Sequence, residues 1–488
     1  WAPSTLSAVA AYYYRPDLRT DMLDNVPVSA KDPNPAQHMT TFTLGLGVDG
    51  VMSYRPDYET ATTGDFYRIR TGDSGCEWAS GVCNWPVPAN NSDTAVDDLW
   101  HAAVSGHGQY FSAQDPASLA AGLSGTLNAL QIKTGAAAAS STSTPNITQQ
   151  DNLEFSATFR TVKWDGELVA QRINTTDGTT AAALIWSARD QLQAKAGNGT
   201  VVDGALTGSA DSRVIFTTTA SGAPAYRDWS WDNLNSTERA WFTNKCAGTG
   251  LLGQCVSLTS GQKDLANSGA FMLDYLRGQK ALQSYQVTGE DPVEVFRNRD
   301  FILGDIAGSK PTYVPNPRRK FSDTGYSTFA STNSARDNMI YVGSNGGMLH
   351  AINVADGTER WAYVPRIVMP NLYQLASTTY GTNHRYFVDG SPSVSDVYIG
   401  GAWKTLLVGG LNKGGRGYYA LDITDPADPK PLWEICSDSA LCPYRNDADM
   451  GFSFSEPIIT KRPSDGKWVV LVTSGYNNVS TGTGKGYL

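Results

Sequence analysis

The spacing of apolar residues changes once along the chain and divides it into two parts. Up to about residue 133, apolar side chains recur at helical spacing in separate stretches. Residues 4–14 predict a helix whose packing face holds Leu6, Val9, Ala10 and Tyr13. Residues 97–104 predict a second helix with acidic residues in its first turn, and Asp115-Pro116 predicts the start of a third. Residues 40–47 predict a short buried strand between them, so this first part has α/β character.

From residue 151 onward the pattern alternates with a period of two, which is typical of half-buried strands. Phe155, Ala157 and Phe159 alternate with polar residues, and residues 163–166 supply the turn of a hairpin. A helical interruption is predicted at residues 268–279, with Phe271, Leu273 and Tyr275 as its packing residues. Residues 134–150 are small and polar and are expected to form a linker.

An internal repeat is the strongest signal in the second part. Residues 339–361 and 407–433 both show a strand, a glycine-rich turn, a second strand, an Asp-containing turn and a Trp. A second register agrees, because three matched pairs are each 65 residues apart: Pro392 and Pro457, Trp403 and Trp468, Gly410 and Gly475. A unit of about four strands cannot bury its own faces, whereas radial packing of neighbouring units can. The repeat therefore predicts blades of a β-propeller, with the Trp and Gly positions at the wedge between blades.

The composition of the chain argues against two classes of protein, nucleic-acid-binding proteins and transmembrane proteins. The formal net charge is −9, and the longest basic run is Arg318-Arg319-Lys320, so a nucleic-acid partner is not expected. No apolar run of 18 residues occurs, and no transmembrane segment is predicted in this chain. The chain starts at a Trp and its last residues align with the inside of a hairpin. We therefore expect it to be a piece of a longer protein.

The six cysteines form three pairs that are close in sequence: Cys76 and Cys83, Cys246 and Cys255, Cys436 and Cys442. An even number in local pairs predicts three loop-closing disulfides and an oxidising compartment outside the cytoplasm. Six buried free thiols in a cytosolic protein are the alternative. Zinc is not expected, because no CxxC spacing occurs and the chain has only five histidines.

Two groups of side chains are candidate metal ligands. Asn446, Asp447 and Asp449 lie in a loop after the third cysteine pair and could offer oxygen atoms to calcium. A solvated turn is the favoured alternative for this loop. Asp97 or Asp98 could share a helical face with His101, where acidic helix-terminal residues and a packed imidazole are the favoured alternative.

Motifs for catalysis are missing from the sequence. It contains no GxSxG, no adjacent Cys-Cys pair and no P-loop, and the glycine-rich residues 409–417 predict a hairpin turn. No catalytic residues are therefore expected.

Several longer sequence segments resemble those of a known protein family. The repeat unit at residues 341–361 resembles the blades of pyrroloquinoline-quinone-type propellers. Other segments, taken together, resemble sequences of the type IV pilus tip-associated adhesin and biogenesis family of the PilY/PilC type. These segments are LGDIAGSKPTYV at 303–314, residues 387–426 and 447–459, and two N-terminal segments at 25–47 and 97–120.

The resemblance implies a mainly β chain. Residues 151–488 would form a partial quinoprotein-like β-propeller. Residues 1–133 would form the C-terminal part of an α/β von Willebrand factor A-type domain, with a loop insertion at 49–96. It implies calcium as a cofactor. The family's Asp-x-Ser-x-Ser and EF-hand-like loops are not found here, so calcium sites are expected outside this chain.

The resemblance also implies a function: an exported, non-catalytic pilus biogenesis factor and adhesin at the periplasm, outer membrane, pilus tip and cell surface. It would bind minor pilins on one surface and host or abiotic surfaces on another. The alternatives are a periplasmic quinoprotein dehydrogenase, for which the Cys-Cys pair is missing, and a propeller scaffold of an outer-membrane assembly machine.

Overall fold

The computed structural model forms two compact units, Trp1–Gln131 and Ile132–Leu488. It describes residues 5–113 except 22, 23, 25, 27–31, 47, 48 and 56, the short strands at 134–136 and 141–142, and residues 152–488 except 198, 203, 204, 208–210, 220–222, 284, 286–292, 320 and 481. The helix predicted after Asp115-Pro116 and most of the predicted linker lie outside the described residues.

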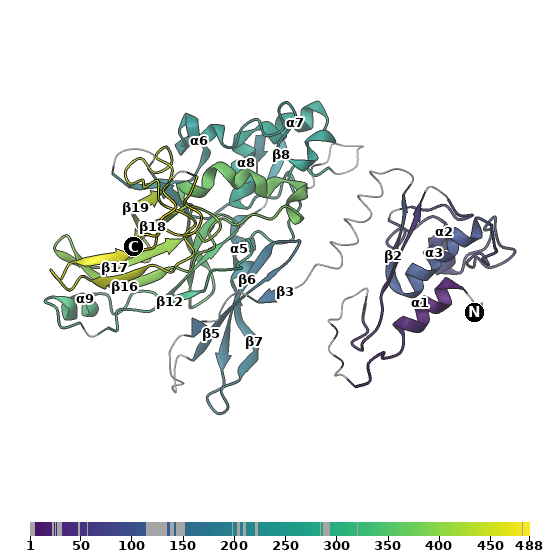
Figure 1. Cartoon of the computed structure of the whole chain (residues 1–488), viewed down its shortest axis with the longest axis horizontal. Helices are drawn as coiled ribbons and strands as arrows, with labels where there is room; N and C mark the ends of the chain where they lie inside the picture. The colour runs from purple at the N-terminus through teal and green to yellow at the C-terminus, as the bar shows by residue number, and fades with distance from the viewer. Residues whose placement is uncertain are drawn as a thin grey trace. The chain divides into compact units, whose positions relative to one another are not determined.

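The first unit combines helices with a parallel pair of strands (Figure 1). Its elements are α1 (Leu6–Tyr14), β1 (Thr41–Leu46), α2 (Asp65–Thr71), α3 (Thr94–Ser105) and β2 (His107–Ala113). β1 and β2 run parallel, as α/β architecture requires for strands joined through helices. An aromatic core closes the unit, with Trp100 on α3 packed among Tyr54, Tyr58 and Tyr110. The α/β character agrees with the prediction, while the assignment to a von Willebrand factor A-type domain stays a prediction.

Of the packing face predicted for α1, Ala10 is confirmed, whereas Leu6, Val9 and Tyr13 were wrong. The structure buries Ser7, Ala10, Ala11 and Tyr14, and it leaves Leu6, Val9 and Tyr13 between 42% and 51% exposed. Small alanines allow α1 to pack against α3, and Tyr14 fixes the rotation of the helix by stacking on His107 at 3.9 Å between ring centroids. The larger apolar residues of α1 consequently face solvent, as does Tyr12.

The second unit begins with an antiparallel sheet of strands β5 (Leu153–Arg160), β6 (Asp165–Ile173) and β7 (Thr180–Ser187). β5 and β6 form the predicted hairpin, and Phe155 and Ala157 are buried as the alternation requires. Two short strands, β3 (Thr134–Ala136) and β4 (Ser141–Thr142), pair with β5 although they lie in the predicted linker. Backbone pairing with a strand edge needs no apolar side chains, so composition alone does not reveal it.

Helices and short strands connect this sheet to the repeat. They are α5 (Ala188–Ala196), β8 (Thr200–Val202), β9 (Ala205–Thr207), β10 (Ile215–Thr218), β11 (Tyr226–Asp228), α6 (Ser236–Ala240), α7 (Ser260–Asn267) and α8 (Gly269–Arg277), with 3-10 turns at Trp231–Asn233 and Gly253–Val256. α8 is the predicted helical interruption, and Phe271, Leu273 and Tyr275 are all buried, as predicted.

The repeat forms two neighbouring antiparallel units of four strands, and β10 and β11 extend the sheet of the first unit to six strands. The first blade contains β12 (Thr312–Val314), β13 (Met339–Ser344), β14 (Met348–Asn353) and β15 (Glu359–Tyr363), with α9 (Tyr326–Thr332) inserted between β12 and β13. The second contains β16 (Ser393–Ile399), β17 (Ala402–Gly410), β18 (Gly417–Asp422) and β19 (Lys430–Cys436). β20 (Ile458–Lys461) and β21 (Trp468–Leu471) repeat the pairing of β16 and β17. The 3-10 segments Arg366–Ala376 and Thr378–Gly381 connect the blades, and β10 extends the first blade by pairing parallel to β15.

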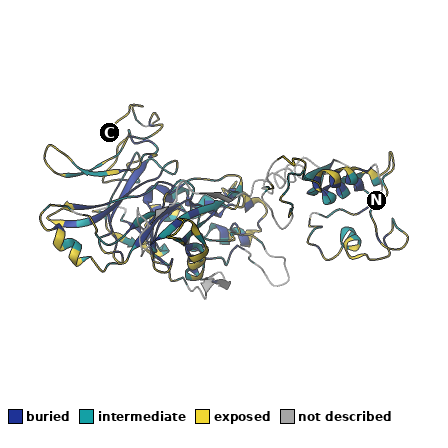
Figure 2. Ribbon diagram, turned by 90° about the horizontal axis from the view of Figure 1, so that it is seen from below, coloured by how far each residue is buried: buried dark blue, intermediate teal, exposed yellow. Residues whose placement is uncertain are grey.

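Contacts between the two blades occur where the repeated residues lie. β13, β17 and β18 are almost entirely buried. Buried strands of the second unit appear dark blue in Figure 2. The indole of Trp361 in the first blade donates to the carbonyl of Pro426 in the second at 2.8 Å. Gly343 lies under the main chain that leads into the second blade, where a Cβ would stand 2.3 Å from the carbonyl oxygen of Val388. The Trp and Gly positions of the repeat therefore form the junction between blades, as predicted.

Candidate functional site

In the loop that is a candidate for calcium, the two carboxylates accept hydrogen bonds from backbone and hydroxyl groups. Asp447 accepts the backbone N–H of Asp449 at 2.9 Å, which closes a local turn. Asp449 accepts both the backbone N–H and the hydroxyl of Thr483 at 2.5 and 2.8 Å, and these hydrogen bonds lower the pKa of its carboxyl. Within the described part of the chain no three His, Cys, Asp or Glu side chains converge as metal ligands. These hydrogen bonds are those of a local turn, the favoured alternative, and a calcium site at Asn446, Asp447 and Asp449 stays a prediction.

The carboxylates predicted near His101 bind backbone amides of other segments. Asp98 accepts the N–H of Leu6 at 2.8 Å at the start of α1, and Asp97 accepts the N–H of Val51 at 2.9 Å. His101 stacks on Trp85 with 4.5 Å between ring centroids. Burial raises the pKa of Asp97 and lowers that of His101. The group thus joins α3 to its neighbours, and its members do not share a ligand position.

Three disulfides connect the cysteine pairs as predicted. They join Cys76 to Cys83, Cys246 to Cys255 and Cys436 to Cys442, and each closes a short loop. The loop at 446–449 follows the third bond in sequence.

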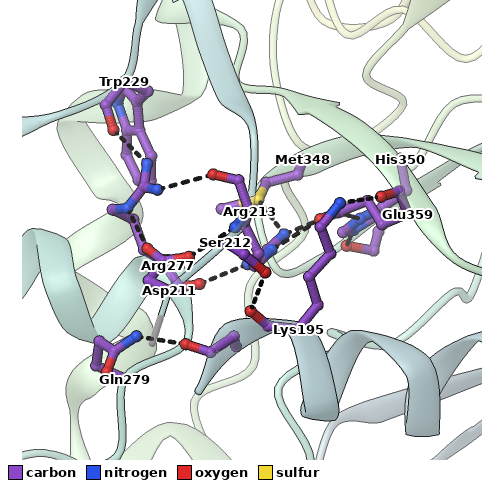
Figure 3. Close-up of polar contacts among 12 residues, drawn as sticks. Lys195, Asp211, Ser212, Arg213, Trp229, Arg277, Gln279, Met348, His350 and Glu359 are labelled. Carbon is purple, nitrogen blue, oxygen red and sulfur yellow. Dashed lines mark hydrogen bonds and ion pairs between the residues drawn. The ribbon is translucent and has the colours of Figure 1, made fainter. Parts of the chain in front are cut away.

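The structure contains a polar network inside the first blade that the sequence did not predict (Figure 3). Glu359 on β15 binds Arg213 with two hydrogen bonds of 2.8 and 2.9 Å, and the Arg213 and Glu359 side chains are 2% and 0% exposed. Glu359 also contacts Nδ1 of His350 on β14 at 2.8 Å. Nε2 of the same ring contacts the hydroxyl of Ser344 on β13 at 2.9 Å. One residue from each of three adjacent strands is therefore connected in a line.

This order of Ser, His and Glu is that of a nucleophile, a base and an orienting carboxylate. The surroundings do not fit such a role. Ser344 and His350 are buried, and the cavity beside them has a volume of about 20 Å³, enough for a single water molecule but not for a substrate. Burial acts to raise the pKa of Glu359, but the charge of Arg213 and the hydrogen bond with His350 hold it well below its ordinary value. Glu359 is thus the permanent counter-ion of Arg213.

The network extends to the helices that cover the blade. Arg213 donates to the carbonyl of Arg277 at the end of α8 at 2.6 Å, and Lys195 of α5 donates to the carbonyl of Glu359 at 2.5 Å. Arg277 in turn binds Asp211 at 2.8 Å. The network therefore connects the β10 segment, α5 and α8 to the strands of the blade, as Figure 3 shows. Only the residue types could have signalled it, because His350 and Glu359 at otherwise apolar strand positions imply buried partners.

A second polar network joins the two blades. Asn345, in the turn after β13, donates to Asp305 at 2.8 Å and to Asp389 at 3.1 Å. Asn412, in the matching turn of the second blade, donates to the other oxygen of Asp389 at 3.1 Å. Burial raises the pKa of Asp389. The repeated turn Asn residues thus hold the connecting segments of neighbouring blades in place.

Comparison with known proteins identifies relatives for almost the whole chain. Residues 303–487 match a family model described as the PilY1 beta-propeller domain. The chain is 32% identical, over 98% of its length, to the Type IV pilus biogenesis factor PilY1 of Pseudomonas aeruginosa strain PAK. A PilY1 homolog of Xylella fastidiosa strain Temecula1 is 37% identical over 45% of the chain and 17% of its own length.

The chain spans 39% of the length of the Pseudomonas relative. Among solved structures, the C-terminal domain of Pseudomonas aeruginosa PilY1 is similar at 38% identity and a TM-score of 0.28, covering 34% of this chain and 32% of that one. None of the described helices is both long enough and apolar enough to cross a bilayer.

Proposed function

This chain belongs to the PilY1 family of type IV pilus biogenesis factors, and on that basis we propose that it acts in pilus assembly as a binding scaffold without catalysis. The single observation that supports this most strongly is the similarity to PilY1 over 98% of the chain, which includes both compact units. The blades form a packed framework, because strands β13 and β18 are buried and hydrogen bonds hold the turns between the blades. Such a framework can present binding surfaces in a fixed arrangement.

The partners in this proposal are minor pilins on one surface and a host or abiotic surface on another, and the protein is exported. Three disulfides support an oxidising location, because such bonds persist outside the cytoplasm. Calcium, which the family resemblance implies, would bind in parts of the relatives that this chain does not span, since the sequence has neither the Asp-x-Ser-x-Ser loop nor the EF-hand-like loop. The relatives do not favour the quinoprotein dehydrogenase or the outer-membrane assembly scaffold.

The proposal is tested in the bacterium that makes the protein. We expect deletion of the full-length protein to reduce the number of surface pili at least tenfold, and its re-expression to restore them. The full-length protein should also be recovered with minor pilins from detergent extracts. Normal piliation after deletion, together with no recovery of minor pilins, would refute the proposal.

A further inference from the structure

A small cavity lies in the second unit beside the first blade. Its volume is about 20 Å³, room for one particle of the size of water. Its lining includes three arginines, Arg213, Arg297 and Arg299, together with Ser344 and Gly346 of the β13–β14 turn. Phe301, Leu276 and Leu375 supply apolar parts of the wall. A space this small that three cations line is unusual, because buried charges are normally paired.

Where the structure describes the chain, the guanidinium group of Arg213 has a carboxylate partner, and those of Arg297 and Arg299 have none. Arg297 donates to the carbonyls of Leu375 and Lys163, both at 3.0 Å. Arg299 donates to the carbonyl of Tyr275 at 2.8 Å and lies over the ring of that residue, 3.7 Å from its centroid. Its Nε is buried and has no hydrogen-bond partner. Within the described residues, neither Arg297 nor Arg299 forms an ion pair.

The nearby carboxylates are occupied by other cations. Asp300 follows Arg299 in sequence but binds Arg160 at 2.9 Å and Lys163 at 3.3 Å. Glu359 is held by Arg213 and His350. Burial lowers the pKa of Arg299 to about 10, so the group still carries its charge at neutral pH. Among the described residues, no carboxylate forms an ion pair with either Arg297 or Arg299, an arrangement that opposes folding unless an anion compensates it.

We propose that this cavity binds one small monovalent anion, chloride being the physiological candidate. The free N–H of Arg299 and the charge of Arg297 would attract it, and the rest of the cavity is small enough to exclude sulfate, phosphate and carboxylates. Such a site would couple the segment at 297–304 to the β13–β14 turn, so that filling it stabilises the junction of the blade with its covering helices. The anion acts as a structural ligand, and no reaction is involved.

The experiment compares thermal unfolding of the full 488-residue chain in sodium chloride and in sodium gluconate at equal ionic strength. Gluconate is too large for the cavity. Because a ligand that binds only the folded state stabilises it by mass action, we expect the unfolding midpoint to rise by about 3 °C between ~1 and ~100 mM chloride. Arg299→Met should lose this rise, while Arg385→Met, which changes an exposed arginine, should keep it.

Equal midpoints of the wild-type chain in the two salts would overturn the proposal, as would a full chloride response in Arg299→Met. If that variant does not fold, crystals of the wild-type chain grown in bromide decide the matter by anomalous scattering. A bromide peak inside the cavity supports the site. Water in the cavity, with bromide at the surface only, contradicts it.

Discussion

Replacing Glu359 by Ala is expected to lower the free energy of unfolding by about 3–5 kcal/mol, because it leaves the guanidinium of Arg213 buried without its carboxylate. The same change removes the partner of His350 Nδ1 and opens space in the middle of the blade. Chemical denaturation of the chain, followed by tryptophan fluorescence, measures the loss.

Two further variants separate loss of the ion pair from loss of volume. The double variant Arg213→Met with Glu359→Leu keeps the interior filled and removes both charges, so it should recover most of the loss. Asp465→Ala removes the partner of the exposed Arg462 and should change the unfolding midpoint little. An Asp465→Ala effect as large as that of Glu359→Ala would show that burial of the pair is not what matters.

The second large effect is expected at the junction of the blades. Gly343→Ala would place a methyl carbon 2.3 Å from the carbonyl oxygen of Val388, a backbone atom that cannot rotate away. Overpacking of this kind typically costs about 1–3 kcal/mol, and we expect the upper end of that range since the main chain itself must move. The unfolding free energy of the variant measures the effect.

Gly261→Ala is the matched control for this substitution. Gly261 lies in α7, and a Cβ added there would meet no atom within 4 Å, so its replacement should be neutral or add about 0.5 kcal/mol through helix propensity. A Gly343→Ala chain as stable as Gly261→Ala would contradict the close packing of the two blades.

The sequence was sufficient for the blades because each repeat matches the next in several independent ways. The Trp and Gly spacing and the period-two alternation all predicted the antiparallel sheets that contain β13 and β17. The cysteine pairs were equally informative, because residues so close along the chain have few other partners.

What could not be predicted depends on tertiary contacts. The rotation of α1 is decided by Tyr14 and by the close approach of alanines to α3, so an apolar stripe alone gave the wrong face. The network of Arg213, His350 and Glu359 joins residues up to 146 positions apart, a distance at which sequence spacing contains no information. The same holds for Asp98, which binds α1 across 92 residues.

The central claim is that the chain works as a folded binding scaffold and that the aligned Ser344, His350 and Glu359 do not catalyse a reaction. The most direct measurement is the number of surface pili supported by full-length protein carrying Ser344→Ala. The variant removes the hydroxyl that contacts Nε2 of His350, so the level of folded variant protein is measured together with the pili. The account predicts a wild-type number of pili. Loss of pili with a stably folded variant would contradict it and would point to chemistry at Ser344.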